Sequence, residues 1–364
     1  MKLPIIVIGG GPAGSICALE LARLGHRVTL AERTTSPTPK LGETCGPRVR
    51  QLLKMAGGLS LPESIYRPLE IFFSAWGSPE IDGRSFTFWQ GETGLVLDRT
   101  AFDKWLLDSA ESAGVTVLRG CKVIGGTWAQ GSWKIEGLVD GRHQTLNASF
   151  IVEATGPRVR SAVQQDVKRV FTDTLVCLSV ELPAQSSESP SVMVESCEVG
   201  WWYTVKLLHG RQIVALFTDV DLLAPAETRL EWLNSLLNET THIRRLVNEF
   251  TKDAKVEVCD ARTSIRNVLW RAGWISIGDA VWSLDPLSGF GIQRAINDGI
   301  NAAPAISRAL TGDAAELRAY AVSQGGSFNE SLRAQRRYYS AEMRWEDAAF
   351  WRRRQRYSHQ ASSV

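Results

Sequence analysis

The chain opens with apolar and polar positions in the order strand, helix, strand. Residues 3–9 and 27–32 are short apolar runs, and residues 15–24 between them repeat apolar side chains at helical spacing and stop at Gly25. Two strands joined by a helix in this way lie parallel in one sheet. The pattern therefore predicts an α/β fold that begins with a parallel sheet.

Further along, the pattern changes to that of antiparallel strands. Residues 69–97 alternate apolar and polar side chains, and residues 170–220 are again rich in strand patterns, most clearly at residues 214–217. Alternation of this kind is typical of antiparallel sheets with one solvated face. We expect a second sheet that is separate from the parallel one.

Helical spacing returns in three places, with short strand patterns between them. The helical stretches are residues 102–113, 227–250 and 292–303. Strand patterns are expected at residues 115–118, 122–128, 133–138, 150–154 and 274–277.

Composition limits the class of protein. The 364 residues are 44% hydrophobic, which is ordinary for a globular protein, and no apolar run approaches the roughly 18 residues of a membrane-spanning helix. The net charge of +2 gives no general attraction to nucleic acid or to an anionic membrane. Six cysteines without a C-x-x-C pair and five histidines without ligand spacing predict no metal site. We expect a cytoplasmic protein with neither nucleic acid nor membrane as a partner.

Residues 9–14 read GGGPAG and fit the G-x-G-x-x-G motif of dinucleotide-binding folds. The motif follows a strand, opens a helix and is followed by Glu32 at the end of the next strand, as a dinucleotide site requires. Gly9 permits the tight turn, Gly11 lets the backbone approach the pyrophosphate, and Gly14 lets helix and strand pack closely. Glu32 is expected to accept a hydrogen bond from a ribose hydroxyl. These features alone leave NAD and FAD open.

Three later segments resemble the glutathione-reductase-type fold in its flavin monooxygenase branch. They are residues 94–103 (GLVLDRTAFD), residues 150–156 (FIVEATG) and residues 278–292, which contain GDA followed by DPLSGFGI. The resemblance covers nearly the whole chain and implies FAD as the cofactor. It also implies that Arg99 reaches the flavin side and that Asp279 binds the ribityl chain.

A helix that begins near Gly291 has a physical reason to face the flavin ring. Reduced flavin is an anion, and the unpaired N–H groups and positive end of a helix stabilise negative charge. Gly289 and Gly291 let the backbone come close to the ring, which a residue with a Cβ atom would hinder. We therefore expect this helix to point at the flavin.

The motif and the resemblance together predict the residues of the site. Asp285 and Pro286 are the expected catalytic residues, in a site where the cofactor supplies the reagent and few side chains are needed. Substrate-facing rings are expected at Trp201, Trp202, Tyr203 and Trp282, although core packing explains any single ring equally well. The residues expected to bind the cofactor are Gly9, Gly11, Ala13, Gly14, Glu32, Arg33, Arg99, Val123, Gly278, Asp279, Pro286, Gly289, Gly291 and Ile292.

Details within the fold resemble the group that joins flavin-dependent halogenases to the flavoproteins that mature cysteine tryptophylquinone enzymes. The similarity lies in residues 41–47, 200–203, 285–288 and 338–354. The W-x-W-x-I-P motif of tryptophan halogenases and their essential lysine have no clear counterpart, so halogenation is not expected. The D-G motif of many aromatic hydroxylases is replaced by residues 153–157, which leaves open how NADPH or NADH would serve as electron donor.

The resemblance implies a monooxygenase that uses reduced FAD and molecular oxygen to hydroxylate a tryptophan of a partner protein, a quinoprotein precursor. Arginines concentrated between Arg333 and Arg356 would suit docking of such a partner, although a solvated helix face is the commoner explanation of such a run. Three alternatives stay open: a hydroxylase of a small or carrier-bound aromatic metabolite, a lipid reductase of the geranylgeranyl type, and a flavin-binding scaffold without turnover.

The predicted architecture is a Rossmann-like FAD-binding domain interleaved with an antiparallel-sheet substrate domain, followed by C-terminal helices. The interleaving is expected because the two kinds of pattern alternate along the chain. The predicted parts are residues 1–68, 95–160 and 255–320 for the FAD-binding domain, residues 69–94 and 161–254 for the substrate domain, and residues 321–364 for the C-terminal helical segment.

Overall fold

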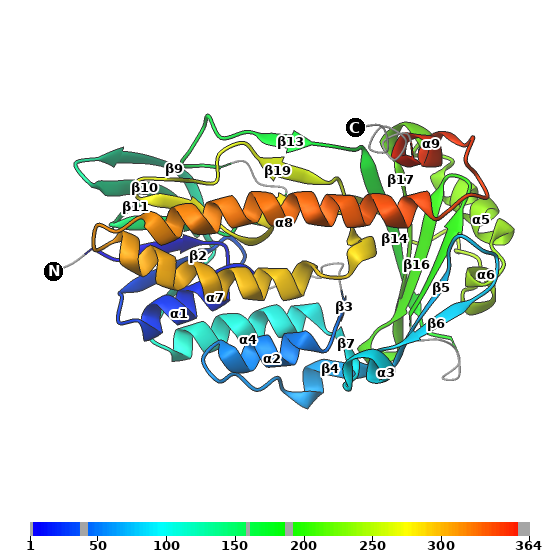
Figure 1. The fold of residues 1–364 in the computed structure, drawn as a ribbon, viewed down its shortest axis with the longest axis horizontal. Coiled ribbons are helices and arrows are strands. Elements are labelled where there is room, and N and C mark those ends of the chain that lie inside the picture. The colour runs from blue at the N-terminus through cyan, green and yellow to red at the C-terminus, as the bar shows by residue number, and fades with distance from the viewer. Residues whose placement is uncertain (1–2, 37–42, 158–160, 186–191, 356–364) are drawn as a thin grey trace.

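The computed structural model describes residues 3–36, 43–157, 161–185 and 192–355. Two large sheets stand at opposite ends of the molecule, and helices run between them (Figure 1). This mixed α/β architecture with C-terminal helices confirms the predicted fold class.

The first large sheet is parallel over its central strands, as the sequence predicts. β1 (Ile5–Ile8) pairs with β2 (Val28–Glu32) on one side and with β12 (Phe150–Glu153) on the other. Every residue of β1 and β12 is buried, which explains why these strands read as continuous apolar runs. The full strand order is β20 (Trp270–Arg271), β21 (Trp274–Ser276), β12, β1, β2 and β8 (Thr116–Arg119).

Helices cover one face of this sheet (Figure 1). They include α1 (Pro12–Arg23), α4 (Arg99–Ser112) and α7 (Gly291–Ala309). A further helix, α2 (Arg48–Met55), packs on α4 and α7. Gly299 of α7 faces α1, because a Cβ atom at this position would lie 2.8 Å from the Ala13 carbonyl oxygen and 2.9 Å from the Cys17 nitrogen. The glycine therefore lets the backbones of α1 and α7 approach each other closely.

Three small sheets complete the framework. The first, which packs on the other face of the parallel sheet, contains β9 (Cys121–Ala129), β10 (Ser132–Val139) and β11 (Arg142–Ala148). The second contains β13 (Arg169–Phe171), β19 (Ser264–Arg266) and β22 (Trp282–Ser283). The third contains β3 (Thr44–Cys45), β4 (Tyr66–Leu69) and β7 (Gly94–Leu97).

The second large sheet has seven strands, and both of its faces are covered. In order they are β18 (Glu257–Asp260), β14 (Leu175–Pro183), β17 (Arg211–Asp219), β16 (Gly200–Lys206), β15 (Val192–Cys197), β5 (Ile71–Ala75) and β6 (Asp82–Ser85). The pairing is antiparallel except between β15 and β5. One face packs on α5 (Arg229–Glu239) and α6 (Ile243–Leu246), and the other packs on the C-terminal segment.

The C-terminal segment joins the two large sheets. α8 (Ala315–Ser340) runs from the parallel sheet to the seven-stranded sheet, and α9 (Ala349–Gln355) packs on the latter (Figure 1). Glu342 lies between these helices and is buried. It accepts hydrogen bonds from the Gly77 nitrogen at 2.8 Å and from the Ser196 hydroxyl at 2.6 Å. This segment is therefore part of the core of the seven-stranded sheet.

Some elements differ from the predicted pattern. β18 extends the seven-stranded sheet into the range predicted for the FAD-binding domain, and α8 continues without a break across residue 320. The predicted helix over residues 227–250 ends after Glu239, because Thr240 has extended φ and ψ angles of −70° and 151°. The alternating stretch at residues 69–97 also contains a short helix, α3 (Phe86–Gln90). Within the described ranges, no helix combines the length and the hydropathy needed to cross a bilayer.

Removal of a large ring from the C-terminal core should destabilise the whole fold. Trp351 is buried and its Nε1 donates to the Cys197 carbonyl oxygen at 2.9 Å. We expect Trp351→Ala to lower the free energy of unfolding by about 3–5 kcal/mol, measured by urea denaturation. Met343→Ala is the control, since Met343 is 59% exposed in the same segment. Equal effects of the two changes would contradict the buried position of α9.

Candidate functional site

Four predicted segments meet at one edge of the parallel sheet. β21, β12, β1 and β2 are neighbours and run parallel, so their carboxyl ends lie side by side. Residues 9–14 follow β1, Glu32 ends β2, residues 154–156 follow β12 and residues 278–280 follow β21. Ligands of open α/β sheets bind at this edge.

The turn after β1 brings backbone atoms into close contact. Gly9 has a φ angle of +108°, and a Cβ atom there would lie 2.4 Å from the Ala154 carbonyl oxygen. A Cβ atom at Gly14 would lie 1.9 Å from the Gly9 carbonyl oxygen. Gly11 differs, because a Cβ atom there would meet no described atom within 4 Å. The space at Gly11 is therefore open to a ligand that approaches the backbone.

The start of α1 has backbone donors available for such a ligand. None of the described side chains caps this helix, whose first turn contains Ala13 and Gly14. Uncapped N–H groups at a helix start bind phosphate well. The Thr155 hydroxyl, in the turn after β12, is also buried with no hydrogen-bond partner in the described part of the chain. These features fit the pyrophosphate of FAD.

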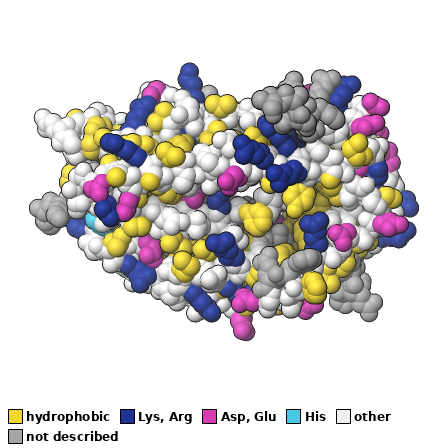
Figure 2. Space-filling model, in the orientation of Figure 1, with side chains coloured by type: hydrophobic (Ala, Val, Ile, Leu, Met, Phe, Trp, Pro, Cys, Tyr) yellow, Lys and Arg dark blue, Asp and Glu magenta, His cyan; other side chains and the backbone are white. Residues whose placement is uncertain are grey.

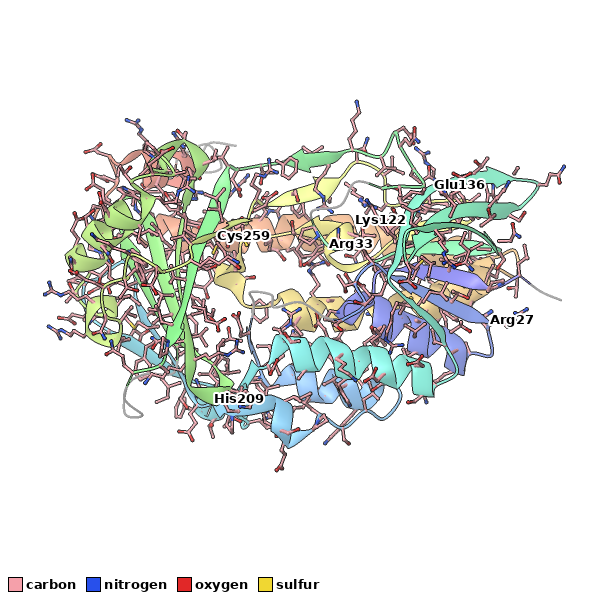
Figure 3. The ribbon with its side chains drawn as sticks, turned by 180° about the vertical axis from the view of Figure 1, so that it is seen from behind. Arg27, Arg33, Lys122, Glu136, His209 and Cys259 are labelled. Carbon is pink, nitrogen blue, oxygen red and sulfur yellow. The ribbon has the colours of Figure 1, made fainter. Side chains whose placement is uncertain are left out.

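Glu32 holds the glycine turn from the second strand. Its Oε2 accepts a hydrogen bond from the Gly10 nitrogen at 2.7 Å, and its Oε1 accepts one from the Thr34 nitrogen at 2.9 Å. The carboxylate is thereby fixed beside the turn, and its contact with the ribose stays a prediction. Arg33 is exposed at the end of the parallel sheet that faces the seven-stranded sheet (Figure 3). Val123 of β9 is half-buried.

Gly278 brings the turn after β21 against α1. It has a φ angle of +60°, and a Cβ atom there would lie 2.7 Å from the Ala13 side chain. The structure thus places these two predicted cofactor-binding residues next to each other.

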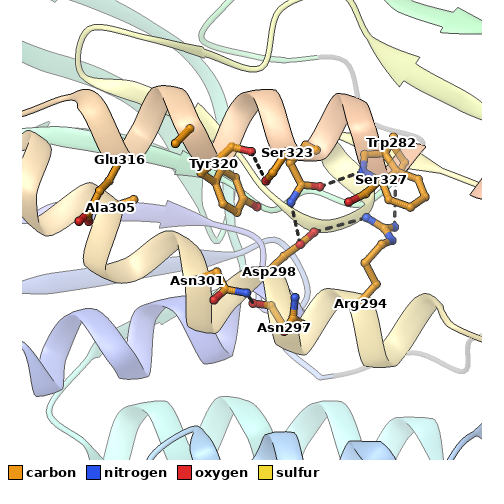
Figure 4. Close-up of a pocket in the computed structure, with 12 residues that line it drawn as sticks. Trp282, Arg294, Asn297, Asp298, Asn301, Ala305, Glu316, Tyr320, Ser323 and Ser327 are labelled. Carbon is orange, nitrogen blue, oxygen red and sulfur yellow. Dashed lines mark hydrogen bonds and ion pairs between the residues drawn. The ribbon is translucent and has the colours of Figure 1, made fainter. Parts of the chain in front are cut away.

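Asp279 pairs with Arg294, which belongs to a polar network between α7 and α8 (Figure 4). Arg294 of α7 forms ion pairs with Asp279 and with the buried Asp298. The Gln324 Nε2 donates to Asp298 at 2.9 Å, and the Trp282 Nε1 donates to the Gln324 Oε1 at 2.8 Å. Burial raises the pKa of Asp298, and the charge of Arg294 opposes this shift. The network lines a cavity of about 460 Å³.

Trp282 lies beneath the Arg294 guanidinium. The central carbon of that group is 3.8 Å from the centre of the ring, and the ring is buried. Packing and a cation–π contact therefore account for Trp282, and the structure does not support the predicted substrate-facing role.

Arg294 and Asp298 are not among the residues predicted from the sequence. Both lie on α7, whose buried face carries Ile292, Ala295 and Gly299 at helical spacing. The sequence shows one carboxylate, Asp298, within this apolar face. Because a buried charge needs a partner, that position could have predicted an ion pair such as the one with Arg294.

The start of α7 exposes backbone to the space before it. Gly289 has a φ angle of +63°, and a Cβ atom at Gly289 or Gly291 would meet none of the described atoms within 4 Å. No side chain from the described residues caps α7, which begins after Phe290. The side chain of Ile292 is buried. A ligand at this turn would therefore contact the backbone and not the Ile292 side chain. A flat ring can approach here, and the positive end of α7 would stabilise an anion.

Asp285 faces away from this open space and into the core. Its Oδ2 accepts hydrogen bonds from the Gln335 Nε2 and the Tyr339 hydroxyl, each at 2.7 Å, and its Oδ1 accepts one from the Leu287 nitrogen at 3.2 Å. Burial raises the pKa of Asp285 above its usual range. The carboxylate is occupied by these donors, so the structure does not support the predicted catalytic role of Asp285. Pro286 is exposed beside it.

The aromatic cluster of β16 divides between the two faces of its sheet. Trp201 is buried, stacks on Phe217 with 3.9 Å between ring centres, and donates to the Tyr339 hydroxyl at 3.0 Å. Trp202 is buried on the opposite face, against α5 and α6. Core packing thus explains both rings, in place of the predicted contact with substrate. Tyr203 is partly exposed, and its hydroxyl lies 3.3 Å from the Thr44 hydroxyl of β3.

The remaining predicted positions are less constrained. Arg99 begins α4, and its guanidinium pairs with Asp103 at 3.2 Å, so its approach to the flavin stays a prediction. In the segment 41–47, residues 41 and 42 lie outside the described residues. No group of acidic, histidine or cysteine side chains suited to a metal ion occurs within the described ranges.

Two glycine substitutions separate ligand binding from folding. Gly11→Ala is expected to change the free energy of unfolding of the FAD-free protein by less than about 1 kcal/mol, because the added methyl meets open space. The same methyl should weaken FAD binding about tenfold or more. Gly14→Ala should lose both stability and FAD, since its methyl meets the Gly9 carbonyl oxygen. Urea denaturation and flavin fluorescence titration measure the two quantities. Unchanged FAD affinity in Gly11→Ala would mean that the pyrophosphate lies elsewhere.

Comparisons with known proteins identify the family and the fold. The chain is 31% identical to the putative FAD-dependent oxidoreductase LodB of Marinomonas mediterranea over 97% of both chains. Its fold matches the myxobacterial chondrochloren halogenase CndH with a TM-score of 0.81, at 22% identity over 99% of this chain and 89% of that one. It also matches the peptidyl tryptophan dihydroxylase QhpG with a TM-score of 0.80, at 24% identity over 98% of this chain and 79% of that one.

Residues 2–322 match the family described as FAD binding domain. This range of the chain includes the glycine turn, Asp279 and the start of α7. The match and the geometry agree on FAD as the cofactor, and the 31% identity to LodB indicates oxidoreductase chemistry. The chain therefore belongs to the FAD-binding domain family of flavin-dependent oxidoreductases.

Proposed function

We propose that this FAD-dependent monooxygenase hydroxylates a tryptophan side chain of a partner protein during biogenesis of a cysteine tryptophylquinone cofactor. The observation that carries the proposal is the exposure of the turn before α7. Pro286 and Ser288 are exposed, and Phe290 is 58% exposed. A site that opens to the surface beside the flavin suits a side chain presented by a folded or extended polypeptide.

Similarity supports the same substrate class. LodB shares 31% identity over nearly the full length of both chains, and QhpG, which is described as essential for tryptophylquinone cofactor biogenesis, shares the fold. These matches cover 97% and 98% of this chain, so they include most of α8.

The FAD supplies the oxygen-transfer chemistry when it is reduced and meets molecular oxygen. The protein has to bind and orient it, which Gly11, Ala13 and Gly14 would do at the pyrophosphate and Asp279 at the ribityl chain. The backbone of Gly289 to Ile292 would hold the ring. NADPH or NADH is the proposed electron donor.

Three of the C-terminal arginines are engaged within the molecule. Arg344 pairs with Glu342 at 2.6 Å, Arg353 pairs with Asp221 at 2.6 Å, and Arg354 pairs with Asp219 at 2.7 Å. These three therefore stabilise the segment itself and are poor candidates for docking a partner.

Arg333 and Arg337 of α8 are exposed. Figure 2 shows basic side chains next to hydrophobic ones over α8 and the start of α7. We therefore place the proposed docking surface on α8 rather than on α9.

The proposal is tested by the fate of oxygen. The FAD-loaded protein, reduced with NADH, NADPH or dithionite, is incubated with a quinoprotein precursor under ¹⁸O₂, and the precursor peptides are analysed by mass spectrometry. We expect ¹⁸O in a single tryptophan. Wild-type protein freed of FAD is the control and should transfer none, and Gly11→Ala at the same FAD concentration should transfer less than the wild type.

Other outcomes would identify an alternative. Oxidation of free indoles or phenols in preference to the precursor would favour a hydroxylase of small aromatics. FAD reduction with no labelled product from either class would favour a scaffold role. Loss of activity in a deletion of residues 333–364 would not discriminate, since the deletion also removes buried residues such as Tyr339 and Trp351.

A further inference from the structure

α8 holds the turn of residues 286–289 on the side away from the proposed flavin site. Asp285 is 2% exposed, and its Oδ2 receives both the Gln335 amide and the Tyr339 hydroxyl at 2.7 Å. Its Oδ1 caps the turn by accepting the Leu287 nitrogen at 3.2 Å. One carboxylate thus ties the turn of residues 286–289 to a helix that the FAD-binding motifs do not include.

The Tyr339 hydroxyl extends this connection to the seven-stranded sheet. It donates to Asp285 and accepts from the Trp201 Nε1 at 3.0 Å, and both rings are buried. Near the end of α8 the Trp76 Nε1 also donates to the Tyr338 carbonyl oxygen at 2.7 Å. A continuous hydrogen-bonded path therefore runs from β16 through α8 to the turn before α7.

We propose that Tyr339 and Gln335 are positioning residues that set the distance between the start of α7 and the flavin ring. They act through Asp285 and do not touch the cofactor. This inference rests on the FAD site and deepens the proposed function, because it assigns the C-terminal helix a part in tuning the flavin.

The contacts of Asp285 with α8 matter for the position of the turn because the other side of the turn is exposed. Pro286, Ser288 and Gly289 are exposed, so the contacts of Asp285 with α8 hold a turn that is open on its other side. The N–H groups at the start of α7 stabilise negative charge on the reduced ring, and this effect falls off within the first turn of a helix. A small displacement of the turn should therefore change the stability of reduced FAD more than that of oxidised FAD.

The test uses the full-length, FAD-loaded protein and Tyr339→Phe. This change removes the hydroxyl and keeps the buried ring. We expect the preference of the protein for reduced over oxidised FAD to fall about tenfold, which corresponds to a potential about 30 mV more negative for a two-electron couple. The visible bands of bound FAD should also shift. Affinity for oxidised FAD should change little, since the phosphate contacts lie at α1.

Matched variants make the result decisive. Tyr338→Phe removes a hydroxyl from the neighbouring residue, which is 50% exposed, and should leave the potential and the spectrum unchanged. Gln335→Leu removes the other donor to the same carboxylate and should shift the potential in the same direction as Tyr339→Phe. The double variant should show less than the sum of the two shifts, because both act through Asp285.

A purely structural role would give a different pattern. In that case Tyr339→Phe and Gln335→Leu would lower the free energy of unfolding but leave the potential and the spectrum of the bound FAD at wild-type values, and the proposal would be overturned. Neither readout involves the partner protein. Failure of the wild-type protein to label a precursor would therefore count against the proposed substrate and leave the positioning role standing.

Discussion

The close approach of α1 to its neighbours is the constraint on which the rest of the structure depends. A Cβ atom at Gly14 would lie 1.9 Å from the Gly9 carbonyl oxygen, and one at Gly299 would lie 2.8 Å from the Ala13 carbonyl oxygen. Because glycine has no Cβ atom, the start of α1 can lie directly at the carboxyl ends of β1 and β12, and α7 can pack along this helix. The same packing aims the uncapped ends of both helices toward the space where the cofactor fits.

Buried carboxylates supply the second constraint, because several of them link the C-terminal segment to the rest of the molecule. Glu342 is paired with the Gly77 nitrogen and the Ser196 hydroxyl, Asp219 with Arg354, and Asp285 with Gln335 and Tyr339. An unpaired carboxylate in these positions would be strongly destabilising, so each pair fixes the C-terminal segment in one place. The segment therefore does more than cover the sheet. It locks the seven-stranded sheet to the loop before α7.

The parts of the fold that the sequence predicts well depend on local spacing. The glycine turn and Glu32 follow from residues within one strand, turn and helix, and the structure brings both to one edge of the parallel sheet. The start of α7 follows in the same way from Gly289 and Gly291 before and at its first turn. The pairing of β18 with β14 and the course of α8 depend on contacts between distant residues, so periodicity cannot supply them. The alternating pattern at β16 likewise shows that Trp201 and Trp202 face opposite ways, but not which layer covers each face.

The difference between local spacing and long-range contacts also explains why Asp285 and Trp282 do not have the roles predicted from the sequence. Asp285 and Trp282 lie in a segment that resembles a flavin site, and residue type alone does not separate a side chain that touches the cofactor from one that supports it. In the structure both turn away from the open space, toward α8 and Arg294. Oxygen transfer by FAD needs orientation and a suitable electrostatic environment more than reacting side chains. A protein with this chemistry is therefore expected to place its buried polar residues behind the backbone that contacts the ring. The Asp285, Tyr339 and Trp201 path has that arrangement.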